Sequence, residues 1–153
     1  SYSLGLTGAS MVVDTACSWS LVPVHLAANS YSNKESELAL VGVVNLLLAP
    51  ILSINFTIAR MLAADGRCTP FDATANGFVR SDCCGVVVLK RLSQAIPPGD
   101  NVLALNRGYA LKQDGASGPL TVPSGPSQEA VVRQALTHAG IKPKEVSYIE
   151  AHG

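Results

Sequence analysis

Residues 12–20 read Val12-Val13-Asp14-Thr15-Ala16-Cys17-Ser18-Trp19-Ser20, and the rest of the chain is interpreted around them. The apolar run 11–13 predicts a short buried strand, and the apolar segment 21–28 predicts a helix. Cys17 is therefore expected where a strand passes into a helix. The free N–H groups and the positive dipole end of a helix stabilise an anion there, which favours a nucleophilic thiolate. The alternative for Cys17 is a small buried thiol, the commonest kind of core cysteine.

The composition limits the class of protein. The chain has 153 residues, which predicts one domain or part of one, and its zero net charge argues against a nucleic-acid partner. Charged residues make up 14%, against about 25% in an average soluble protein, so we expect part of the surface to be covered by further chain or a partner. The four cysteines lack metal-ligand spacing and fit a reducing, cytoplasmic compartment. With neither signal peptide nor initiator Met, we expect an internal segment of a longer protein.

One stretch is long and apolar enough to suggest a membrane span. Residues 38–59 carry no charge, and about 20 such residues can cross a bilayer. Asn45, Pro50 and several hydroxyl and amide residues interrupt the stretch. We therefore expect a buried strand at Leu38–Leu48 and a separate segment after Pro50, with no membrane span.

The remaining elements are expected from hydrophobic periodicity and from glycine and proline positions. Strands alternate with helices, which predicts a layered α/β fold with much parallel pairing. The expected strands are 38–45, covered on both faces, and 86–89, 102–111 and 146–149. The expected helices are 58–68 and the segment after Pro126, which ends at Gly140; turns are expected at 97–100 and 113–115. His25 is expected to pack in the interior and His138 to be solvated.

Five stretches of the chain form an ordered set. They are residues 14–22; the apolar run 38–45; residues 65–92, which include Gly77-Phe78-Val79-Arg80 and Cys84-Gly85-Val86-Val87-Val88-Leu89-Lys90-Arg91-Leu92; residues 120–130, Leu-Thr-Val-Pro-Ser-Gly-Pro-Ser-Gln-Glu-Ala; and residues 146–153, which end in Glu150-Ala151-His152-Gly153. In this order they resemble the β-ketoacyl synthase (ketosynthase) domains of modular type I polyketide synthases. The chain departs from that pattern at Pro23, at Asn76 and in Ser81-Asp82-Cys83, which stands where the family has Gly-Glu-Gly.

The resemblance implies a partial thiolase-like fold, an α/β/α layered architecture with a mostly buried mixed sheet. It implies an N-terminal segment, residues 1–98, and the start of a C-terminal segment, residues 99–153. It makes Cys17 the catalytic nucleophile and His152 the first catalytic histidine. The family's second histidine, a lysine and the glycine-rich oxyanion loop lie outside the chain, so we expect these 153 residues alone to be inactive.

The resemblance also implies a reaction and its partners. An acyl chain is transferred to the cysteine and then condensed, with loss of carbon dioxide, with a malonyl-type extender. The domain itself binds no cofactor or metal, because both substrates are thioesters on the phosphopantetheine of acyl carrier protein. Expected partners are acyl carrier protein, neighbouring polyketide synthase domains and a second copy that pairs through residues 10–14; nucleic acid and membrane are not expected.

Three other functions are alternatives at this stage. A degradative thiolase has the same fold and a second catalytic cysteine, whose motif is not found here. A non-catalytic scaffold or carrier-protein docking domain is favoured modestly by Trp19 and by the altered 81–83 loop. A papain-like hydrolase using Cys17 and His152 lacks support from the residues that flank Cys17.

Overall fold

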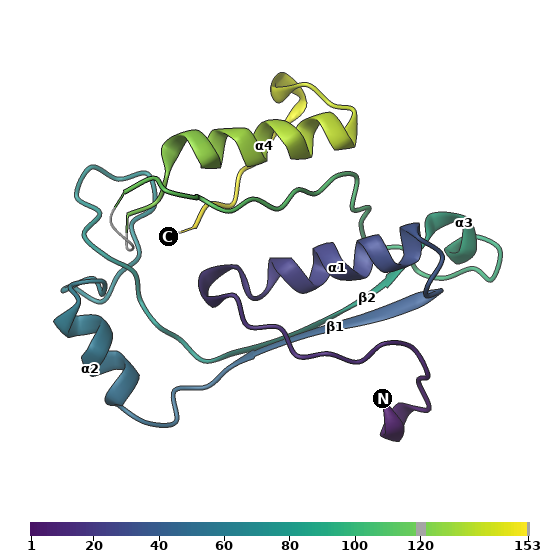
Figure 1. The fold of residues 1–153 in the computed structure, drawn as a ribbon, viewed down its shortest axis with the longest axis horizontal. Coiled ribbons are helices and arrows are strands. Elements are labelled where there is room, and N and C mark those ends of the chain that lie inside the picture. The colour runs from purple at the N-terminus through teal and green to yellow at the C-terminus, as the bar shows by residue number, and fades with distance from the viewer. Residues whose placement is uncertain (119–121, 153) are drawn as a thin grey trace. The chain divides into compact units, whose positions relative to one another are not determined.

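A computed structural model describes residues 1–118 and 122–152 (Figure 1). Its helices are α1 (Leu21–Ser32), α2 (Ile51–Ile58), α3 (Leu92–Ala95) and α4 (Gly125–Ala139), and its strands are β1 (Leu38–Asn45) and β2 (Cys83–Lys90). Short 3-10 turns occur at Tyr2–Leu4, Ala16–Ser18 and Pro143–Glu145. The chain forms two compact units. The first unit contains Ser1–Val41 and Val86–Val146, and the second contains Gly42–Gly85 and the residues from Ser147 on.

Helix α1 confirms the helix expected after the nucleophile stretch. Pro23 is the third residue of α1 and so lies in the first turn, where its missing N–H breaks no helical hydrogen bond. Val22 and Ala28 are its buried residues. At the other end, the Tyr31 carbonyl oxygen accepts hydrogen bonds from the Lys34 N–H at 3.2 Å and from the Arg91 guanidinium at 3.1 Å.

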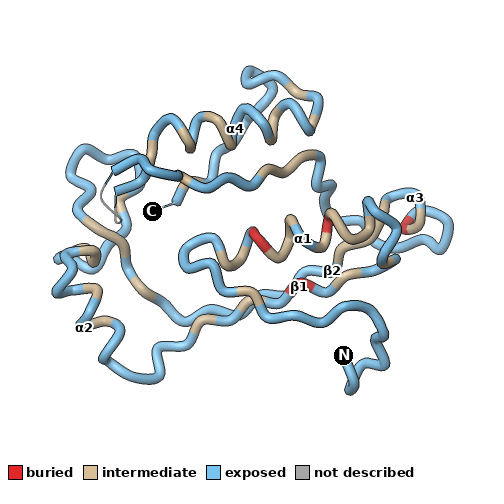
Figure 2. Tube along the Cα trace, in the orientation of Figure 1, coloured by how far each residue is buried: buried red, intermediate tan, exposed pale blue. Residues whose placement is uncertain are grey.

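The buried core of the described residues lies in the first unit. The buried apolar side chains are those of Val22, Ala28, Val41 and Ala95, contributed by α1, β1 and α3 (Figure 2). Most other apolar residues are partly or largely exposed. Nearly all of the tube in Figure 2 is accordingly pale blue or tan. The low charge content therefore corresponds to a large exposed apolar surface.

Strands β1 and β2 form a two-stranded antiparallel sheet. Both strands were expected from their apolar runs, and both are present. Their burial and pairing differ from the expected mostly buried mixed sheet. Val41 is the buried residue of β1, and residues 83–88 of β2 are all exposed. The prediction assumed a covering layer on each face, and the described residues do not provide one.

Helix α4 confirms the helix predicted from Pro126 and Gly140, and the structure adds a serine cap that was not predicted. The Ser124 side chain accepts a hydrogen bond from the Ser127 N–H at 3.3 Å, Pro126 occupies the first turn, and Gly140 ends the helix with a left-handed φ of 65°. The family-like stretch 120–130 begins before this helix, and its residues 120 and 121 lie outside the described residues.

Helix α2 corrects one expectation. A helix was expected at 58–68, but it covers Ile51–Ile58 and begins after Pro50. Arg60 has a left-handed φ of 56°, which prevents the helix from continuing, and Leu62 instead forms a parallel bridge with Phe78. The uncharged stretch 38–59 therefore divides at Pro50, as predicted, and the segment after Pro50 is a short helix. None of the helices found in residues 1–118 and 122–152 has the length and apolar character needed to cross a bilayer.

Three expected strands do not form in the described residues. No strand forms at 11–13, 102–111 or 146–149. The apolar side chains of these segments are largely exposed: Val12 is fully exposed and Leu103 is 89% exposed. A strand requires a neighbour that satisfies its N–H and C=O groups. These segments have the composition of strands, but they have no such neighbour among the described residues. The local sequence pattern was therefore not sufficient to predict a strand.

Candidate active site

Cys17 lies in a tight turn that precedes helix α1. The turn is the 3-10 segment Ala16–Ser18, and α1 begins at Leu21. The thiol is exposed and free. The expected position, directly between a strand and a helix, is therefore corrected on both sides. No strand precedes the turn among the described residues, and the long helix starts four residues after Cys17.

The residue before Cys17 has an unusual backbone. Ala16 has a φ of 52°, in the left-handed region that side-chain-bearing residues seldom adopt. Such conformations cost on the order of 1–3 kcal/mol and persist where their surroundings enforce them. They are enriched at active sites, but Lys34, Arg60 and Phe71 also have a left-handed φ. The angle therefore supports the turn as a candidate site only together with the thiol beside it.

Polar side chains of the same motif hold the turn. The Asp14 carboxylate accepts a hydrogen bond from the Ala16 N–H at 3.1 Å, and the Ser18 hydroxyl donates to the Thr15 carbonyl oxygen at 3.1 Å. The Trp19 N–H donates to the Ala16 carbonyl oxygen at 3.0 Å. The acid and hydroxyl residues around Cys17 thus have a local role: they fix a turn that presents an accessible thiol, as a covalent nucleophile requires.

Exposure by itself does not distinguish Cys17 from the other cysteines. All four are free and exposed. The Cys68 sulfur accepts a hydrogen bond from the Val79 N–H at 3.2 Å, whereas Cys83 and Cys84 are consecutive residues of β2, whose side chains alternate between faces. Cys17 is distinguished by its strained, hydrogen-bonded turn.

His152 belongs to the second unit and is exposed. It follows the 3-10 turn Pro143–Glu145 and the segment 146–149, near the end of the described residues. In this segment the Tyr148 hydroxyl donates to the Glu150 carboxylate at 2.8 Å. Cys17 lies in the first unit. The two predicted catalytic residues therefore belong to different units.

The altered 81–83 loop is fixed to the end of strand β1. The Asn45 side-chain amide donates to the Ser81 carbonyl oxygen at 2.6 Å, and the Leu47 N–H donates to the Asp82 carboxylate. Cys83 then begins β2. The loop therefore has a defined geometry without the glycines that the family has at these positions.

Two ionisable groups of the described residues have perturbed pKa values. Burial raises the pKa of the Tyr31 phenol, and charge repulsion with Tyr109 raises it further. Hydrogen bonds from the Thr74 hydroxyl and N–H lower the pKa of the exposed Asp72 carboxyl. Neither group is close in sequence to Cys17 or His152.

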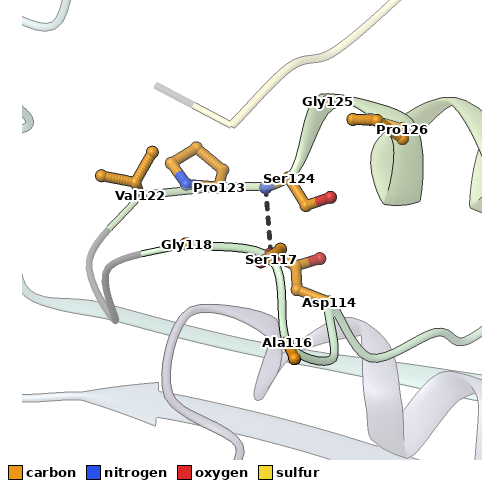
Figure 3. Close-up of a pocket in the computed structure, with 9 residues that line it drawn as sticks. All are labelled: Asp114, Ala116, Ser117, Gly118, Val122, Pro123, Ser124, Gly125 and Pro126. Atoms are coloured by element: carbon orange, nitrogen blue, oxygen red, sulfur yellow. Dashed lines mark hydrogen bonds between the residues drawn. The ribbon is translucent and has the colours of Figure 1, made fainter.

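A hollow of about 480 Å³ lies at the N-terminal end of helix α4 (Figure 3). It is lined by the loop residues Asp114–Gly118 other than Gly115 and by Val122–Pro126. In it the Asp114 carboxylate accepts a hydrogen bond from the Ser124 N–H at 3.1 Å, the dashed line of Figure 3. Asp114 therefore joins its loop to the first turn of α4. In the described part of the chain, no group of three or more metal-ligating side chains is assembled.

A side-chain cluster in the first unit was not predicted from the sequence. His25 was expected to pack, and it does: its ring lies edge-to-face on Tyr109, with ring centroids 5.0 Å apart. His138 was expected to be solvated; it is exposed, but its Nδ1 also lies 3.0 Å from the Tyr109 carbonyl oxygen. Tyr109 is 84 residues from His25 and 29 residues from His138 in the sequence, so no local sequence pattern predicts these contacts.

Almost the whole chain matches models of known protein families. Residues 1–95 match the family model of the β-ketoacyl synthase N-terminal domain, and residues 103–153 match that of the β-ketoacyl synthase C-terminal domain. Among curated proteins, two different subunits of the phenolphthiocerol/phthiocerol polyketide synthase of Mycobacterium tuberculosis are similar to this chain. One is 51% identical over 99% of the chain, and the other is 51% identical over all of it. The chain spans only 7% and 8% of the length of these two relatives.

Solved structures give the same result for the fold. The oxazolomycin ketosynthase domain of Streptomyces albus JA3453 superposes with a TM-score of 0.96 at 36% identity, over 99% of this chain and 27% of that one. The ketosynthase from module 6 of the bacillaene synthase of Bacillus subtilis 168 gives a TM-score of 0.87 at 43% identity, over 90% of this chain and 25% of that one. The predicted thiolase-like α/β fold is therefore confirmed for the described residues.

Proposed function

Because the chain belongs to the β-ketoacyl synthase family, with both its N-terminal and its C-terminal domain represented, we propose that it is the nucleophile-bearing part of a polyketide ketosynthase. The observation that carries this proposal is the placement of Cys17. It lies within the matched N-terminal domain, in an exposed turn with a left-handed residue immediately before the thiol. An accessible thiol on a rigid turn suits acyl transfer better than a structural role.

The proposed first step is acyl transfer to Cys17. The Cys17 thiolate attacks the carbonyl carbon of an acyl thioester carried on the phosphopantetheine of acyl carrier protein. The bond from that carbon to the phosphopantetheine sulfur breaks, and the released thiolate takes up a proton. N–H donors must stabilise the tetrahedral oxyanion, and the backbone N–H of Cys17 is one candidate.

The proposed second step forms the carbon–carbon bond. A malonyl-type extender on acyl carrier protein loses carbon dioxide, and the electron pair of the broken bond forms an enolate. This carbanion attacks the acyl carbonyl carbon on Cys17, and the Cys17 thiolate leaves. We assign His152 to the extender side, where an imidazole would hydrogen-bond the enolate oxygen of the thioester.

Partners follow from the same proposal. The chain would act with acyl carrier protein and with neighbouring domains of a polyketide synthase, because its curated relatives are polyketide synthase subunits many times its length. We also propose a homodimer that pairs through residues 10–14. The largely exposed Met11 and the fully exposed Val12 support this, because an apolar segment without a strand neighbour can be covered by its counterpart.

The proposal is tested by acyl loading in the full synthase. Cys17→Ala should abolish covalent loading from an acyl thioester, whereas Cys84→Ala, at an exposed cysteine of β2, should leave it intact. His152→Ala should still load the acyl group but lose decarboxylation and condensation. Continued loading by Cys17→Ala would refute the assignment, and a His152→Ala variant that condenses normally would remove His152 from the mechanism. A protein that docks carrier protein but never loads would instead be a scaffold.

A further inference from the structure

Four side chains meet where helix α1, the segment around Tyr109 and helix α4 come together in the first unit. The Tyr109 ring lies between two imidazoles, edge-to-face to each. Its centroid is 5.0 Å from that of His25 on α1, at 89°, and 4.5 Å from that of His138 on α4, at 77°. The Tyr109 hydroxyl donates to Asn29 Oδ1 of α1 at 3.2 Å. One tyrosine therefore contacts both helices through its ring.

The backbone at Tyr109 is also fixed. The Tyr109 carbonyl oxygen lies 3.0 Å from His138 Nδ1. A Cβ atom added at Gly108 would lie only 2.5 Å from the Ala135 carbonyl oxygen and 2.6 Å from the Ala139 nitrogen. The segment thus lies directly against the backbone of α4, and Tyr109 cannot move toward α4 without a clash.

The hydrogen bonds of this cluster determine where the protons lie. The Tyr109 hydroxyl has one proton and gives it to Asn29 Oδ1, so the Asn29 amide nitrogen faces His25, 3.0 Å from Nε2. An amide nitrogen only donates, so Nε2 must accept and the ring proton must be on Nδ1. That Nδ1 is buried and has no hydrogen-bond partner in the described part of the chain.

This proton arrangement is unfavourable for His25 by itself. A buried N–H group without an acceptor destabilises a structure. In the other tautomer of His25 the proton would be on Nε2, and the unpaired Nδ1 would be an acceptor instead of a donor. The Asn29 amide N–H donates to His25 in its Nδ1–H form, and the Tyr109 hydroxyl donates to Oδ1 of the same amide. The hydrogen bonds therefore run from Tyr109 to Asn29 and from Asn29 to His25.

We propose that Tyr109 is a positioning residue of the synthase, which acts through Asn29 and His25 to hold helix α1 in one setting behind the Cys17 turn. The helix begins at Leu21, four residues after Cys17, so a change in its setting moves the nucleophile turn. The relation to catalysis rests on the function proposed above. The relay itself rests only on the contacts of the first unit.

Two variants of the full synthase separate a relay from a simple structural contact. Tyr109→Phe keeps the ring and removes only the hydroxyl. Asn29→Asp keeps an acceptor for that hydroxyl but cannot donate to His25 Nε2, so it reverses the proton order. A structural hydrogen bond would survive Asn29→Asp, whereas the relay would not. Tyr2→Phe, at a fully exposed tyrosine of the same unit, is the matched control.

Two rates are measured on each variant: alkylation of Cys17 by iodoacetamide, mapped by mass spectrometry, and acyl transfer from an acyl thioester. Tyr109→Phe and Asn29→Asp should each slow both rates with KM for the thioester unchanged. The upper bound is about fivefold, which corresponds to the roughly 1 kcal/mol that one hydrogen bond contributes to stability. Because the residues act in series, the double variant should be no slower than either single one. Tyr2→Phe should match the unaltered protein.

The outcomes distinguish the two proposals. Unaltered rates in Asn29→Asp, or additive losses in the double variant, would overturn the relay. Absence of acyl transfer in the unaltered synthase would refute the proposed function, while the alkylation rates would still test the relay. Should Tyr109→Phe fail to fold, Asn29→Asp and its alkylation rate decide the question alone.

Discussion

Substitution of Gly108 by alanine should separate helix α4 from the segment that carries Tyr109. The new Cβ would lie 2.5 Å from the Ala135 carbonyl oxygen, 2.6 Å from the Ala139 nitrogen and 2.7 Å from the Ala139 Cβ. Favourable contact begins at about 3.5 Å, so the two segments must move apart by roughly 1 Å. Two of the three obstructing atoms are backbone, which no rotamer change can relieve. We therefore expect a loss of stability of about 1–3 kcal/mol, the usual range for overpacking.

Thermal unfolding and hydrogen exchange of residues 125–139 in the full synthase would measure this effect. Gly108→Ala should lower the protection of α4 and lower the melting temperature of the unit. Gly125→Ala, at the first residue of the same helix, is the matched control, because its added Cβ would meet nothing within 4 Å. It should be neutral or slightly stabilising, since alanine restricts the unfolded chain. If Gly108→Ala proves as stable as Gly125→Ala, the close approach of the segment to α4 is wrong.

Three further predictions concern other parts of the chain. Ser124→Ala removes the cap that accepts from the Ser127 N–H and should destabilise α4 by about 1 kcal/mol, measured as faster exchange in its first turn; unchanged exchange would mean that the cap contributes nothing. Trp19→Ser should raise the rate of Cys17 acylation by long acyl thioesters, because a large ring two residues after the nucleophile narrows the acyl site; an unchanged or lower rate would mean that Trp19 packs away from it. The raised pKa of Tyr31 means that its contribution to stability is complete below about pH 10 and is lost as pH rises through the folded-state value. Tyr31→Phe should therefore reduce the loss of stability in alkaline melts, and an unaltered alkaline profile would count against this.

Local sequence signals were sufficient where an element depends on its own residues. The early proline and the final glycine predicted α4 because each acts within one helical turn, whereas the Ser124 cap was not predicted. The apolar runs of β1 and β2 were also recognised, and each strand has the other as its neighbour. The segments 102–111 and 146–149 have similar runs, but a strand also requires a neighbour, and composition does not show whether one is present.

The helix after Pro50 shows a different limit. The sequence pattern supported a helix at 58–68, but the left-handed backbone of Arg60 placed the boundary earlier. Nothing in the type of residue signals that conformation, since arginine is an ordinary helix former.

The candidate site was predictable in part. The motif around Cys17 made it the candidate nucleophile, but it did not show that its turn precedes α1 by several residues or that Ala16 is left-handed. The contacts of Tyr109 with His25 and His138 were not predictable, because they connect residues far apart in the chain through the packing of two helices.

The left-handed backbone of Ala16 also limits how this sequence can vary. A β-branched side chain is a genuine outlier at such a φ, whereas glycine adopts it freely and asparagine tolerates it. In a saturation library at this position, selected for acyl loading, alanine, glycine and asparagine should survive and valine, isoleucine and threonine should disappear. The residue before the nucleophile would then be selected for its backbone angle, and its side chain would take no part in the chemistry.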